Sequence, residues 1–176
     1  MNLVIANRQR TKKINPRSLR QIVGGLMTEL KITEAKLGIN LVGAKEMARI
    51  NEQFLQHAGA TDVITFDYGP VVGPASSRSC LPQKKKPGRL EAGPTILHGE
   101  LFVCVDEAVS QARHFQTSWQ SEIVRYIVHG VLHLRGHDDL KPDLRRKMKR
   151  AENRLVRALA RRFSLAQLST AAKLGT

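Results

Sequence analysis

Two histidines one helical turn apart, in the stretch YIVHGVLHLRGHDD at residues 126–139, constrain this chain more than any other feature. His129 and His133 lie inside an apolar run, and on an α-helix their spacing places both rings on one face. Gly136 then offers a point where the helix ends and the chain reverses. Two rings fixed on a helix, with a further ligand returned by a turn, predict a metal site with one coordination position open.

The third ligand of this predicted site is open between two residues. Asp139 lies six residues after His133, far enough past Gly136 for its carboxylate to turn back toward the rings. His137 lies four residues after His133, and its ring would share the helical face only if the helix continued through the glycine. Chain geometry favours Asp139, although the softer imidazole would suit zinc. We therefore predict His129, His133 and Asp139 as metal ligands, with His137 as the alternative, and a metal-bound water as the one reactive group.

The chemistry of such a site depends on the residue after the first histidine. Gly130 stands where the zinc peptidase signature requires a glutamate as general base. Its presence disfavours peptidase chemistry but leaves open attack on a phosphodiester, where stabilisation of charge at phosphorus matters most. A pair of separately hydrogen-bonded core histidines is the other interpretation, and it would require a polar partner for each buried ring.

Charge is the strongest compositional signal. The chain has 29 Lys and Arg against 15 Asp and Glu, a formal net charge of +14. Such a field attracts polyanions, of which nucleic acid is the most common. The last predicted helix, between residues 141 and 162, carries ten basic and two acidic residues directly after the metal segment. Arg145, Arg146 and Lys149 are therefore predicted to contact nucleic acid.

The composition also bears on the cellular setting. No apolar run approaches the roughly 20 residues that a membrane span requires. The apolar part of the N-terminal segment is too short for a secretory signal. We therefore expect a cytoplasmic protein with no membrane partner.

Hydrophobic periodicity predicts strands alternating with helices, followed by helices alone. Strand patterns cover residues 3–6 (an edge strand), 36–42, 60–69 and 99–105, and helical patterns cover 16–30, 44–55, 106–115, 119–134 and 142–162. Phe115 is expected to point inward, and the 119–134 helix, which is apolar nearly all round, is expected to be buried. An α+β or a three-layer α/β fold fits, with one mixed sheet of about four strands, about five helices and the metal-bearing helix at the centre.

Residues 1–165 are predicted to form a single metal-hydrolase domain, and residues 166–176 a frayed tail. Within the domain, residues 69–97 hold five of the seven prolines and a run of three lysines. This composition predicts a long surface loop. The loop is either a plain insertion or a further contact with RNA.

The chain resembles the YbeY family of metal-dependent endoribonucleases. HGVLHLRGHDD matches the family pattern HGxLHLxG(Y/H)DH, with His129 and His133 on the first two ligand positions and Asp139 where the family usually has histidine. INEQFLQHAGATDVITF, residues 50–66, is similar to the family's LNxxYRxxDxPTDVLSF. HGEL, residues 98–101, is similar to the family's LGDI.

The resemblance implies an α+β fold and one zinc ion per chain, with no small-molecule cofactor. It also implies single-strand-specific RNA cleavage, maturation of the 3′ end of the small-subunit ribosomal RNA, and ribosome quality control, with ribosomal RNA and the ribosome as partners. Leu55 stands where the family has an arginine thought to serve RNA binding or catalysis, and His57 is a candidate replacement.

Two other functions compete with this one. The first is a metallopeptidase-like hydrolase. The second is a non-catalytic module that binds RNA or the ribosome and holds a structural metal. A structural zinc site is closed by four protein ligands, whereas the sequence offers three good ones, so catalysis is favoured.

Overall fold

A computed structural model of the chain describes residues 1–56, 59–69 and 96–170. In these residues the chain forms four strands, five α-helices and a short 3-10 helix, in the order β1 (Asn2–Asn7), α1 (Pro16–Glu29), β2 (Glu34–Val42), α2 (Ala44–Leu55), β3 (Val63–Asp67), β4 (Ile96–Cys104), α3 (Val105–His114), α4 (Trp119–Leu134), α5 (Pro142–Arg162) and η1 (Leu165–Leu168). The predicted α+β fold with one mixed sheet and about five helices is confirmed.

The four strands form one sheet in the order β1-β2-β4-β3. β1 pairs with β2 and β2 with β4 in parallel, while β3 pairs with β4 in antiparallel orientation. β1 is an edge strand, as predicted. One row of paired residues crosses the sheet through Ile5, Ile39, Leu101 and Thr65. Because side chains alternate between the two faces of a strand, this whole row points to the same side.

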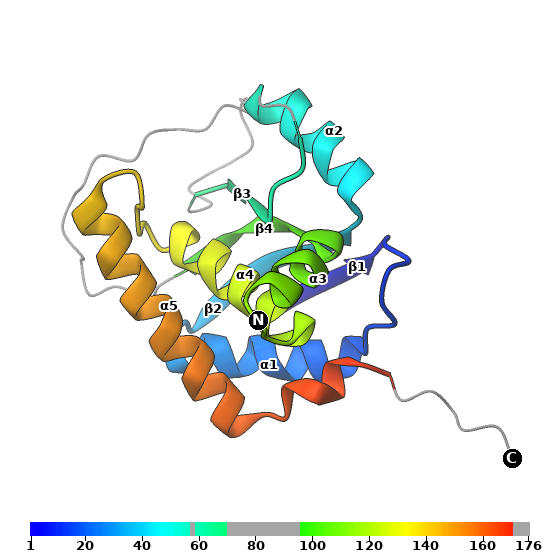
Figure 1. The fold of residues 1–176 in the computed structure, drawn as a ribbon. Helices are drawn as coiled ribbons and strands as arrows, with labels where there is room; N and C mark the ends of the chain where they lie inside the picture. The colour runs from blue at the N-terminus through cyan, green and yellow to red at the C-terminus, as the bar shows by residue number, and fades with distance from the viewer. Residues whose placement is uncertain (57–58, 70–95, 171–176) are drawn as a thin grey trace, which may run out of the picture.

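The main hydrophobic core lies on that side of the sheet, under α1, α3, α4 and α5. A smaller cluster on the other side joins Met47 of α2 to Val42, Ile64 and Cys104. Figure 1 shows α4 between α3 and α5 on the helical side of the sheet, and α2 apart from this group. The helix that carries His129 and His133 is therefore central, as the sequence predicts.

α4 is buried along most of its length and approaches the sheet closely at Gly130. A Cβ at this position would lie 2.6 Å from Leu101 Cδ2 and 3.1 Å from Thr65 Oγ1. A glycine is thus required because the helix backbone packs directly onto the row of residues that crosses the sheet. This contact sets the distance between α4 and the sheet, and with it the position of both histidines.

Three predicted details are wrong. Phe115 does not point inward but is 63 % exposed, because α3 ends before it and Gln116, at φ 54°, turns the chain away from the core. The predicted 69–97 loop ends too late, since Ile96 and Leu97 belong to β4 and Leu97 pairs with Ala35 of β2. Residues 70–95 lie outside the described part of the chain.

The predicted frayed tail also begins too early. Leu168 is fully buried, and its carbonyl accepts a hydrogen bond from the Asn15 backbone N–H at 2.8 Å. Ser169 forms an antiparallel bridge with Ile14. An apolar residue buried against α1 and α4 thus holds the chain as far as Thr170, and residues 171–176 lie outside the described residues.

Candidate metal centre

The end of α4 places Asp139 next to the two histidines. Gly136, at φ 83°, donates its N–H to the His133 carbonyl at 2.8 Å, and His137 N–H bonds to the Leu132 carbonyl at 3.0 Å. This pair of bonds is a Schellman motif, which ends a helix at a residue in the left-handed conformation. The chain reverses after it and brings Asp139 back over the helix.

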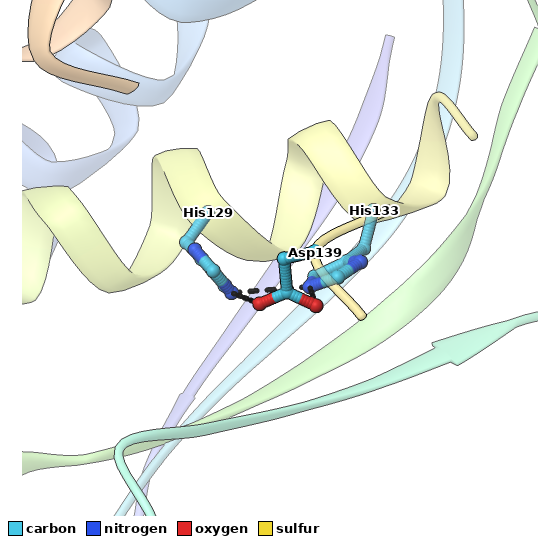
Figure 2. A group of neighbouring side chains, drawn as sticks. All are labelled: His129, His133 and Asp139. Carbon is cyan, nitrogen blue, oxygen red and sulfur yellow. Dashed lines mark hydrogen bonds and ion pairs between the residues drawn. The ribbon is translucent and has the colours of Figure 1, made fainter. Parts of the chain in front are cut away.

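The three predicted ligands meet at one point (Figure 2). His129 Nε2 and His133 Nε2 are 3.0 Å apart. The Asp139 carboxylate faces both rings, with Oδ2 3.8 Å from His129 Nε2 and Oδ1 3.9 Å from His133 Nε2. All three side chains are partly exposed, at 24 % for His129, 31 % for His133 and 35 % for Asp139, so water reaches the cluster. The arrangement could hold a metal ion.

The hydrogen bonds of the two rings fix which nitrogens face each other. His129 Nδ1 lies 3.1 Å from Glu152 Oε2, and His133 Nδ1 lies 3.1 Å from the His137 carbonyl oxygen. Both partners are acceptors, so each Nδ1 carries the proton and donates it. Each neutral ring then turns a bare Nε2 lone pair toward the other, and two lone pairs at 3.0 Å require a cation or a shared proton between them.

The spacing suits a tetrahedral cation. Two nitrogens bound to zinc at the usual length lie about 3.3 Å apart. The observed 3.0 Å between the Nε2 atoms is close to that value. The two distances from the ring nitrogens to the Asp139 oxygens are somewhat longer. The donor set of two imidazoles and one carboxylate therefore fits a divalent metal.

Glu152 of α5 supports the cluster from behind His129. This carboxylate is 3 % exposed, accepts hydrogen bonds from Arg125 Nη1 at 2.5 Å and Lys149 Nζ at 3.0 Å, and accepts the His129 Nδ1–H. Burial raises the pKa of Glu152, but the hydrogen bonds from His129, Arg125 and Lys149 outweigh it and lower that pKa to about 2. A buried, ionised carboxylate behind a ligating histidine orients the ring and raises its basicity.

His133 is kept neutral by its surroundings. Burial and the neighbouring His129 lower the pKa of His133, while Asp139 partly opposes them. A neutral imidazole is the form that binds a metal. His137, in contrast, is exposed and contributes its backbone carbonyl to the His133 ring.

The cluster opens into a cavity of about 770 Å³. α4 forms its floor, α5 one wall and α3 the other, in line with the positions of these helices in Figure 1. The lining includes His129 and Asp139 from the cluster and Thr61 and Asp62 before β3. The cavity therefore gives a ligand access to the centre.

The residues predicted to contact RNA divide into two groups. Arg145, Arg146 and Lys149 all line the cavity, on the α5 wall, and all three are exposed. His57 lies outside the described residues, as does the side chain of Leu55. The structure thus gathers the three α5 cations in the cavity that His129 and Asp139 also line.

Sequence reasoning missed Glu152 and Arg125. One signal for Glu152 was available, because it falls on the apolar stripe of α5 between Met148 and Leu155, all three of which are buried. An acidic residue at a core-facing position requires a buried partner. The chain contains several cations that could serve, and their spacing alone does not identify Arg125.

Comparisons with known proteins agree with the fold and the motifs. The family model described as Endoribonuclease YbeY matches residues 4–160. A protein named Endoribonuclease YbeY from Chlorobium luteolum is 34% identical over 119 residues, covering 68% of this chain and 70% of the relative. Another with that name, from Salinibacter ruber, is 28% identical over 149 residues, covering 85% of this chain and 86% of the relative.

Among solved structures, the solution structure of TM1509 from Thermotoga maritima superposes with a TM-score of 0.58, covering 99% of each chain at 19% identity. This likeness concerns the fold alone. The family model spans most of the chain and includes both histidines and Asp139. The chain therefore belongs to the YbeY family.

Proposed function

We propose that this protein is a zinc-dependent, single-strand-specific endoribonuclease that matures the 3′ end of the small-subunit ribosomal RNA and acts in ribosome quality control. Its partners would be ribosomal RNA and the ribosome, in the cytoplasm. The observation that carries the proposal is the pair of bare Nε2 atoms facing Asp139 beside a basic helix. The family name Endoribonuclease YbeY supplies the reaction class.

The proposed ligands are His129, His133 and Asp139, which would hold one zinc ion. When bound, the ion supplies Lewis-acid activation of water and stabilises negative charge at phosphorus. Three protein ligands leave one coordination position for solvent, as in catalytic zinc sites. Asp139 is preferred over His137 because its carboxylate faces both Nε2 atoms.

Other residues of the chain would hold the centre and the substrate. Glu152 keeps the His129 ring in the orientation that exposes Nε2. Arg145, Arg146 and Lys149 would bind backbone phosphates, since they are exposed cations on the wall next to the cluster.

None of the helices in the described residues combines the length and apolar composition that crossing a membrane requires.

The metallopeptidase alternative lacks a place for its general base. The peptidase glutamate would replace Gly130, where even a Cβ atom would lie 2.6 Å from a side-chain carbon of the sheet. This position faces the sheet, whereas His129 faces the cavity. A glutamate there would neither fit nor reach a bound substrate.

The first test combines metal analysis with cleavage assays. We expect one zinc ion per chain and cleavage of single-stranded ribosomal RNA, but not of duplex RNA or casein. Chelation should abolish cleavage and added zinc should restore it. His133→Ala should still bind RNA without cleaving it. RNA binding by zinc-loaded wild type with no cleavage of any RNA would reject the enzyme and leave the binding module.

A matched pair of variants tests the third ligand. Asp139→Ala should lose zinc, whereas His137→Ala should keep it, because the contact of His137 with the cluster runs through its backbone carbonyl. Equilibrium zinc affinity measured by competition with a chelator gives the answer. The opposite ranking of the two variants would identify His137 as the ligand.

A further inference from the structure

The α3 wall of the cavity differs in chemistry from the α5 wall. Glu107 and Gln111 lie four residues apart on one face of α3, and Phe115, the first residue after the helix, lines the cavity with them. None of the three is basic. A phosphate would be repelled by this wall, so it suits another part of a nucleotide.

Phe115 presents a large aromatic surface at the cavity. Its side chain is 63 % exposed, and the His114 ring packs perpendicular to it with the ring centroids 4.7 Å apart. An exposed aromatic ring in a cavity that also has a cationic wall is a common platform on which proteins stack unpaired bases.

Two carboxylates on the same side of the cavity retain capacity to accept hydrogen bonds. Glu107 accepts one from Gln111 Nε2 at 2.6 Å. Asp62 accepts from the Thr61 hydroxyl at 3.0 Å and the Val63 N–H at 2.8 Å, both on Oδ1. Neither carboxylate forms an ion pair with any cation in the described ranges. They therefore remain available to N–H donors of a ligand.

Tyr126 of α4 gives independent evidence that this end of the cavity takes a polar ligand. The residue is 4 % exposed and lines the cavity, yet its hydroxyl has no hydrogen-bond partner within the part of the chain that the structure describes. Burial, followed by the nearby Asp62 and Glu122 carboxylates, raises the pKa of Tyr126, so the hydroxyl keeps its proton. A buried hydroxyl without a partner is unfavourable, and a bound polar group would remove that cost.

We propose that the space between α3 and α4 is a nucleobase subsite, in which the base next to the cleaved phosphate stacks on Phe115 and donates hydrogen bonds to Glu107 and Asp62. The phosphates would then follow the α5 wall. The two walls thereby set the direction in which the base points.

This subsite discriminates between bases by their hydrogen-bonding edges. Guanine offers two adjacent N–H groups on its Watson–Crick edge, which match carboxylate acceptors. Uracil offers one N–H between two carbonyl oxygens, which face the same carboxylates unfavourably. The subsite therefore prefers guanine and excludes uracil, and adenine and cytosine, each with one exocyclic amine, fall between them.

The inference rests on the proposed function but is tested separately from it, by binding. Two labelled pentaribonucleotides, UUGUU and UUUUU, are titrated with metal-free protein and followed by fluorescence anisotropy. We expect wild type to bind UUGUU at least about tenfold more tightly than UUUUU. Phe115→Ala should weaken both RNAs about tenfold, and Phe115→Trp should restore both. Glu107→Gln and Asp62→Asn should bring the two affinities together, because each removes a carboxylate acceptor of the base.

The control variant is Arg161→Ala, an exposed residue on α5 about 24 Å along the helix from Arg145. It should leave the preference for guanine unchanged. Equal affinity of wild type for the two RNAs, or a preference that survives both Glu107→Gln and Asp62→Asn, would overturn the subsite. Selective binding by a wild type that cleaves no RNA with zinc would reject the nuclease and retain the subsite.

Discussion

The two walls of the cavity handle acidic residues in opposite ways. On the α5 wall, Glu152 is buried and fully engaged by Arg125, Lys149 and His129, while exposed cations form the outer surface. On the α3 wall, Glu107 is half-buried and forms no ion pair with the described residues, next to an exposed aromatic ring. One wall uses its acid to hold the protein together, and the other leaves its acid available to a ligand.

Under the proposed function, this difference would let one basic protein both attract and orient RNA. A cavity lined by cations alone would bind phosphate in any direction. A cavity with one cationic wall and one wall of acceptors and an aromatic ring distinguishes backbone from base. The cluster of His129, His133 and Asp139 lies on the floor between the two walls, where the two parts of the proposed nucleotide would meet.

The largest expected effect concerns the acid of the α5 wall and the pH dependence of stability. The pKa of Glu152 is lowered from its ordinary 4.5 to about 2, so the folded state holds the ionised form more strongly than the unfolded state does. This stabilisation is complete above pH 4.5 and is lost as pH falls toward 2. It amounts to about 3 kcal/mol. Urea unfolding of metal-free protein across this window should show the loss in wild type.

Glu152→Gln should remove most of that pH dependence. Asp143→Asn is the matched control, because it makes the same change on an exposed residue of the same helix. If the stability of Glu152→Gln still falls with decreasing pH as steeply as that of wild type, the ionised Glu152 carboxylate does not stabilise the fold.

The next effect concerns the same carboxylate and the metal. Glu152→Gln keeps the shape of the side chain but loses the charge that orients and polarises the His129 ring. Changes in such supporting carboxylates typically reduce metal affinity or activity about 10- to 100-fold. Zinc affinity measured by chelator competition should show this reduction, and Asp143→Asn should show none. Unchanged affinity would place Glu152 in the fold alone.

The local parts of both fold and site could be predicted from the sequence. His129 and His133 share a helix, and Gly136 lies within the same few residues, so short-range rules were enough to bring Asp139 back. The resemblance to the family pattern pointed to the same three positions, with Asp139 where the family usually has histidine. The helix of residues 119–134 was predicted with the bounds that the structure shows, because its apolar pattern and flanking polar residues are local signals.

The parts that depend on tertiary packing could not be predicted. Glu152 reaches His129 only because α5 packs beside α4, and the sequence does not give the angle between them. β4 lies between β2 and β3 in the sheet, and this order depends on pairing between strands that are far apart in the sequence. Phe115 was expected inside because helical periodicity was extended one residue past the true end of α3. The exposed Phe115 ring gives the α3 side of the cavity an aromatic surface.

A further effect concerns α4, the floor of the cavity, at the point where Gly130 packs against the sheet. Gly130→Ala would place a methyl group 2.6 Å from Leu101 Cδ2, so α4 or the sheet would have to shift. Overpacking of this kind costs about 1–3 kcal/mol of stability. Gly24→Ala in α1 is the control, because a Cβ there meets nothing within 4 Å, and it should instead stabilise the helix by about 0.5–1 kcal/mol. Thermal unfolding of both variants measures the contrast, and equal effects would contradict the close approach.

The smallest effect addresses the two walls directly, through the salt dependence of RNA binding. Each phosphate contact releases counterions, so the logarithm of affinity falls linearly with the logarithm of salt concentration. Arg146→Ala and Lys149→Ala should each reduce that slope by about 1, whereas Arg161→Ala should not. Phe115→Ala should lower affinity at every salt concentration and leave the slope unchanged, because stacking involves no phosphate. If Phe115→Ala changed the slope, or if the α5 variants did not, the division of the cavity into a phosphate wall and a base wall would be wrong.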